Sequence, residues 1–153
     1  MSLHGNGRRP SRTGLFASAV VLCVVSAPGA AAEWASVAKT ERTEVFVEDA
    51  SIARSGALVS VLTRQNFVEP QPATRAGKTY LSARNEYRVD CAARRLAYRE
   101  IRAYTQPDLQ GDVVQKTRIG EKNLKWMDAP ESTVFGELLD YTCQRAPSVA
   151  QSP

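Results

Sequence analysis

Apolar and polar residues alternate through much of the chain between residues 34 and 117, which is the pattern of half-buried β-strands. The tract Glu69-Pro70-Gln71-Pro72 is expected to break this pattern, because proline cannot donate to a strand ladder. A loop is predicted over residues 68–78, and Gly111 marks a second turn. The predicted strands are two short ones at Trp34–Val37 and Val45–Val47, a longer one at 58–67, and one at 113–117.

The segments 80–91 and 94–105 both alternate and are predicted to form a β-hairpin. With Cys91 opposite Arg94, apolar residues face apolar ones and charges face opposite charges, whereas a shift of one residue would mix them. Ala92-Ala93 is a poor two-residue turn, so the connection is either two or four residues long in this register. The register pairs Val89 with Leu96, Tyr87 with Tyr98, Leu81 with Tyr104, Asp90 with Arg95 and Glu86 with Arg99.

Helical spacing replaces the alternation near the C-terminus. Asp128 is predicted to cap the helix, with Pro130 in its first turn and Glu131 completing a reciprocal cap. The apolar stripe that follows is expected to pack on the sheet and consists of Val134, Phe135, Leu138, Leu139 and Thr142. These patterns predict one domain over residues 33–143 that is mostly β, with a single helix near its C-terminal end. A flexible tail is predicted over residues 144–153.

Residues 1–32 have the three parts of a secretory signal peptide: the basic residues Arg8, Arg9 and Arg12, an apolar centre, and Ala30–Ala32. Cleavage is predicted after Ala32. The apolar centre spans residues 15–25, which is 25 − 15 + 1 = 11 residues, while a membrane span needs roughly 20. We therefore expect export to the periplasm or cell surface and no transmembrane span in the mature chain.

Two other export routes leave weaker signals. The pair Arg8-Arg9 is found in twin-arginine signals, but Pro10 follows directly and the usual downstream pattern is missing. Lipidation would use Cys23, but Leu22 stands where a small residue is required. The general secretory route is favoured.

Removal of the signal leaves 153 − 32 = 121 residues and takes away the single histidine, His4. Three of the 20 basic residues are also lost and no acidic one, so the formal charge becomes 17 − 16 = +1. A near-neutral chain has no basic footprint for a phosphate backbone, so no nucleic-acid partner is expected.

Cys91 and Cys143 remain in the mature chain. In an oxidising compartment they are predicted to form a structural disulfide, because redox-active pairs usually lie a few residues apart and these are 143 − 91 = 52 apart.

The usual chemistry of catalysis is missing from a mature chain without histidine. No phosphate loop, calcium loop or histidine metal site is present, so no cofactor, no metal and no enzymatic activity are expected. The remaining enzymatic alternative is a carboxylate pair, for which Glu48-Asp49 and Asp108 near Asp112 are the candidates.

The order of these signals resembles the surface-adhesin protein E family of secreted proteobacterial proteins. The resemblance covers nearly all of the mature chain. It rests on Trp34, the segment 49–56, Tyr80-Leu81-Ser82, Glu86, Asp90-Cys91, Gly111-Asp112-Val113-Val114, Trp126, Pro130-Glu131-Ser132 and Cys143.

The resemblance implies an α+β fold: an antiparallel sheet of about six strands with a C-terminal helix packed across it and tethered by the disulfide. It also implies adhesion to host matrix and plasma proteins such as laminin, vitronectin and plasminogen. The alternative is a periplasmic or envelope structural protein without a host ligand. Neither the ligand nor the oligomeric state follows from the sequence.

The candidate partner-binding residues are arginines of the predicted hairpin. Arg84, Arg88 and Arg99 lie among acidic residues, so they form either a recognition patch for a protein partner or a solvated face of cross-strand ion pairs. The same hairpin also carries Arg94, Arg95 and Arg102. The loop 68–78 is the second candidate contact region.

Overall fold

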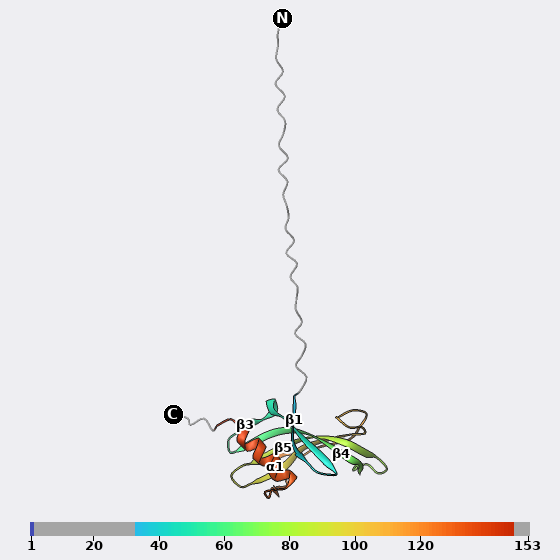
Figure 1. The fold of residues 1–153 in the computed structure, drawn as a ribbon, viewed down its shortest axis with the longest axis vertical. Coiled ribbons are helices and arrows are strands. Elements are labelled where there is room, and N and C mark those ends of the chain that lie inside the picture. The colour runs from blue at the N-terminus through green and yellow to red at the C-terminus, as the bar shows by residue number, and fades with distance from the viewer. Residues whose placement is uncertain (2–32, 149–153) are drawn as a thin grey trace.

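The computed structural model describes residues 33–148 together with Met1. One antiparallel sheet of eight strands carries a single α-helix on one face (Figure 1). Six strands follow one another across the sheet in the order β1-β2-β4-β5-β6-β7, while the short β3 pairs with β4 and β8 pairs with β6. The elements are β1 (Trp34–Lys39), β2 (Thr43–Glu48), β3 (Ala53–Ser55), β4 (Leu58–Pro72), β5 (Thr79–Asp90), β6 (Arg95–Tyr104), β7 (Val113–Arg118), β8 (Met127–Asp128), α1 (Val134–Arg145) and the 3-10 turns η1 (Asp49–Ser51) and η2 (Glu121–Asn123).

This architecture confirms the predicted α+β fold, with an antiparallel sheet and one C-terminal helix. The signal peptide predicted over residues 1–32 and the last residues of the predicted tail lie outside the described residues. Helix α1 continues to Arg145, two residues beyond the predicted end of the domain at Cys143. Among the described helices, none has both the length and the apolar character that crossing a membrane requires.

The core lies between α1 and the strand face beneath it. Alternate residues of the central strands point to this face and are fully buried, among them Val47, Val61 and Val89. Leu138 and Leu139 of the predicted helical stripe are 1% exposed and pack against them. Each such buried aliphatic side chain contributes about 1.5–3 kcal/mol, so this packing fixes which face of the sheet the helix covers.

The disulfide joins the two parts of the core. Cys91 follows β5 directly and Cys143 lies in the last turns of α1, and their Cα atoms are 5.9 Å apart in the bonded pair. The predicted pairing is confirmed, and it ties the helix to the central hairpin.

The hairpin register was predicted correctly only at one end. Asp90 faces Arg95 and Tyr87 faces Tyr98 across a four-residue connection, but a bulge follows between Tyr87 and Glu86. The predicted pairing of Glu86 with Arg99 is therefore wrong, because Arg99 is the extra residue. Its carbonyl accepts from the Ile119 amide, and its guanidinium donates to the Ile119 carbonyl. Alternation alone does not reveal an inserted residue.

Beyond the bulge every pair is shifted by one residue. Glu86 faces Glu100, and Ser82 rather than Leu81 faces Tyr104. The shift changes which charged side chains are neighbours on the exposed side of the sheet.

The predicted end of the long strand was also wrong. Strand β4 continues through both prolines to Pro72, because their fixed φ is compatible with extended backbone. The prolines do disturb the ladder: pairing with β5 is interrupted between Asn66 and Gln71. The connection to β5 is shortened accordingly to residues 73–78.

The predicted helix start was five residues too early. Thr133 is the N-cap, and its hydroxyl accepts from the Gly136 amide at 3.0 Å. Asp128 instead belongs to β8 and pairs with Arg95 of β6. The cap-like sequence at 128–131 forms a strand and a turn instead, because backbone groups at Asp128 pair with β6.

Candidate binding face

Within residues 33–148, no α-helix covers the sheet face opposite α1, and we call it the open face. Strand register brings four basic side chains into one line across it. Arg64 of β4 faces Arg84 of β5, Arg84 faces Arg102 of β6, and Arg102 faces Lys116 of β7. We call these four residues the cation row. Adjacent strands lie about 4.8 Å apart, so the cations are direct neighbours.

The members of the cation row differ in their partners. Arg64 forms an ion pair with Asp108 at 3.2 Å and lies 4.1 Å from the ring centre of Phe46. Arg102 pairs with Glu100 at 3.2 Å. Arg84 lies between two arginines and makes no ion pair with any residue in the described part of the chain.

A second line of side chains runs beside the cation row and carries the acidic residues. Glu86 faces Glu100, which in turn faces Arg118. Glu86 pairs with Arg88 at 2.7 Å, and Glu100 is shared by Arg102 and Arg118. These carboxylates neutralise part of the positive charge, but none of them reaches Arg84.

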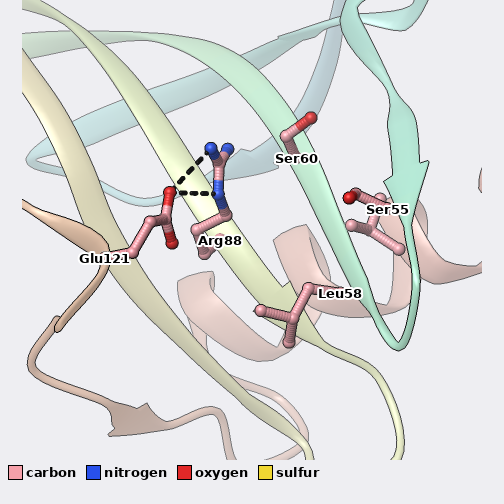
Figure 2. A pocket seen from close by; sticks show the side chains of 6 residues that line it. Ser55, Leu58, Ser60, Arg88 and Glu121 are labelled. Carbon is pink, nitrogen blue, oxygen red and sulfur yellow. Dashed lines mark hydrogen bonds and ion pairs between the residues drawn. The ribbon is translucent and has the colours of Figure 1, made fainter.

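The structure divides the three arginines that the sequence singled out. Arg88 and Arg99 both approach the carboxylate of Glu121, each at 2.9 Å, and their side chains are only 22% and 14% exposed. Figure 2 shows Glu121 pointing toward Arg88 from the segment that follows β7. Two of the three candidates are therefore held in one cross-element ion-pair cluster, and Arg84 stands apart from it.

The other hairpin arginines have structural partners. Arg94 binds Asp140 of α1 at 2.7 Å and lowers the pKa of that carboxyl group. Arg95 pairs with Asp90 at 3.1 Å. The pKa of Asp90 is lowered first by the hydrogen bond from the Ala93 amide and then by Arg95. The Arg94–Asp140 pair fixes the turn of the hairpin to α1, and the Arg95–Asp90 pair joins the two strands at that turn.

Two hollows lie side by side along β4 on the open face. One, of about 320 Å³, has Arg88 and Glu121 on one side and Ser55, Leu58 and Ser60 on the other (Figure 2). The second, of about 290 Å³, is lined by Arg84 and Glu86 together with Ser51, Ser60 and Leu62. Arg84 therefore borders space that a ligand group can enter.

One member of each acidic pair considered for catalysis makes a structural contact. Asp108 accepts from Asn66 and pairs with Arg64, and Asp49 accepts a hydrogen bond from the Tyr141 hydroxyl at 2.9 Å. Within residues 33–148, no three histidine, cysteine or acidic side chains come together as a metal site requires. The open face is therefore a charged surface with two hollows along β4.

The sequence did not identify Arg64, Lys116 or Glu121 as site residues. They lie on different segments and join the site only through strand order, which alternation does not specify. A signal was present for Arg64, because its parity within the predicted strand placed it on the face away from Val59, Val61 and Thr63. Lys116 had no such signal, because β7 contains no buried residue.

A family model described as surface-adhesin protein E matches residues 34–144. The structure of Haemophilus influenzae protein E is similar, with a TM-score of 0.52, 13% identity, and coverage of 72% of this chain and 83% of that one. A crystal structure of protein E from non-typeable Haemophilus influenzae has a TM-score of 0.51 at 14% identity and covers 80% and 87%. No curated protein sequence matches the chain. The likeness to the solved structures is one of fold.

Proposed function

Because the chain belongs to the surface-adhesin protein E family, we propose that it is an adhesin of the bacterial envelope that contacts host extracellular matrix or plasma proteins. The family match extends from the start of β1 into the last turn of α1. The signal-like order of residues 1–32 supports export of the domain from the cytoplasm.

The observation that carries the proposal is the open face. It offers a broad, charged surface on the side of the sheet that α1 leaves uncovered, and it contains Arg84, Arg88 and Arg99. We place the contact with the protein partner at these three arginines. Arg84 is available for a direct ion pair, whereas Arg88 and Arg99 contribute charge that is partly compensated by Glu121.

The location is tested on intact cells. Protease added to the outside should remove the protein, whereas a periplasmic structural protein would be spared until the outer membrane is opened. Mass spectrometry of the exported product should find Glu33 as its first residue. A product that keeps Cys23 or carries lipid would contradict the proposed processing.

The binding activity is tested with the purified mature chain on immobilised laminin, vitronectin and plasminogen. Saturable binding to one or more of them is expected, with weakening as salt screens the charges over about 8 Å at physiological ionic strength. Absence of binding to all three, together with protection from protease on intact cells, would favour the structural protein without a host ligand.

A further inference from the structure

Arg84 is in an electrostatically unfavourable position in the isolated protein. It lies directly between Arg64 and Arg102 on neighbouring strands, and like charges that face each other across strands destabilise a sheet. Its two neighbours each have one carboxylate partner, whereas Arg84 has none among the described residues. The row therefore has uncompensated positive charge at Arg84.

We infer that the cation row binds the sulfate groups of a linear sulfated polysaccharide, the class to which the glycosaminoglycan chains of host matrix belong. The inference rests on the proposed adhesin function and names the chemical group that the open face would take.

The geometry of the row favours a chain over a compact anion. Four cations span three interstrand steps, which is about 14 Å. A single sulfate or phosphate reaches only one or two of these side chains, whereas a polysaccharide with repeated sulfates can meet all four. Guanidinium groups also bind such oxyanions through two parallel hydrogen bonds, which gives the arginines of the row a geometric match.

The position of the row argues against a peptide that binds by adding a strand to the sheet. Such peptides bind at a sheet edge, where free backbone groups extend the ladder. Arg84 and Arg102 lie on β5 and β6, which are paired on both sides, so their backbone groups are already used. The row offers side-chain charge alone, which suits a ligand recognised by its sulfates.

The two ends of the row extend the contact surface. Phe46 faces Arg64 on β2, and its ring stacks on the Arg64 guanidinium and holds that end of the row in place. Lys116 is exposed at the other end on β7. The hollow beside Arg84 has room for a substituent of the polysaccharide that points toward the sheet.

The test measures binding of a labelled heparin oligosaccharide to the mature protein by fluorescence anisotropy. Arg84→Gln is expected to raise the Kd about 10- to 100-fold, the effect of losing a charge-assisted contact. Arg42→Gln is the matched control: it makes the same charge change at an exposed site between β1 and β2, outside both candidate contact regions, and should leave the Kd within about twofold. Arg84→Lys keeps the charge without the two-pronged geometry and should lie between them.

Thermal unfolding separates lost binding from lost folding. Because Arg84→Gln removes a charge placed between two like charges, its Tm should equal or exceed that of the wild-type protein. An affinity loss accompanied by a lower Tm would point to a structural role and overturn the inference.

Three further results would contradict the inference: an unchanged Kd in Arg84→Gln, an equal loss in Arg42→Gln, or equally tight binding of desulfated heparin or polyglutamate. Adhesion to matrix with and without glycosaminoglycan removal separates this inference from the proposed function. Adhesion that persists on depleted matrix, with no heparin binding, refutes the polysaccharide ligand and leaves the adhesin. Absence of adhesion to both the intact and the depleted matrix refutes both the polysaccharide ligand and the proposed adhesin function.

Discussion

The backbone before α1 passes so close to Gly136 that the site has no room for a side chain. Replacement of Gly136 by alanine should therefore destabilise the protein. A Cβ atom there would overlap the carbonyl oxygen of Pro130, and it would lie 3.0 Å from that carbonyl carbon and 3.3 Å from the Cα of Glu131. The Gly136 amide also donates the capping hydrogen bond to the Thr133 hydroxyl oxygen. The turn before the helix is thus folded against its first turn.

The expected change in the free energy of unfolding follows from two opposed effects. Alanine in place of glycine favours a helix by about 1 kcal/mol. Overpacking costs about 1–3 kcal/mol, and the upper end applies because the obstacle is backbone and not a flexible side chain. Gly136→Ala should therefore lower the free energy of unfolding by about 2 kcal/mol.

Urea unfolding measures this, with a lower midpoint and an unchanged m-value as the expected result. Gly120→Ala is the matched control, because the nearest atom to the new Cβ would be the side-chain nitrogen Nδ2 of Asn123 at 3.7 Å. It should stay within about 0.5 kcal/mol of wild type. If Gly136→Ala is as stable as the wild-type protein, or more stable, the described approach of the turn to the helix is wrong.

Three other outcomes are expected. Cys91→Ser should lower the unfolding free energy by about 2–5 kcal/mol, and labelling of the native protein should find no free thiol at Cys91 or Cys143; two reactive thiols would refute the bond. Thr133→Ala should cost about 1 kcal/mol in urea unfolding and Asp128→Ala much less; the reverse order would restore the earlier helix start. Burial raises the pKa of Tyr87, so its phenol stays neutral when folded but ionises near pH 10 when unfolded. Stability should therefore fall above about pH 10, and less steeply in Tyr87→Phe; an identical fall would contradict this.

The sequence was sufficient for the parts of the fold that depend on periodicity. Alternation located the central hairpin, helical spacing found the stripe of α1, and the export signal with two remaining cysteines predicted the bond between Cys91 and Cys143. Each of these depends on local residue order or on a count, so no knowledge of the tertiary arrangement was needed.

The errors have one physical origin, which is tertiary pairing that overrides a local preference. Arg99 is inserted as a bulge because its backbone and side chain bind Ile119, twenty residues further along the chain. Asp128 has the character of a helix cap but pairs with β6. The cation row has the same origin, because Arg84 meets Arg64 and Arg102 only after the strand order and the shifted register are known.

The central claim is that the open face carries the contact with host matrix or plasma proteins through Arg84, Arg88 and Arg99. The most direct measurement is binding to immobilised laminin, vitronectin and plasminogen by the triple variant Arg84→Glu, Arg88→Glu and Arg99→Glu, after circular dichroism and urea unfolding establish that it is folded. We predict loss of binding, with a residual that falls further as salt is added. Unchanged binding by the folded triple variant would contradict the assignment and redirect the search to the tip of the β4–β5 hairpin over residues 68–78.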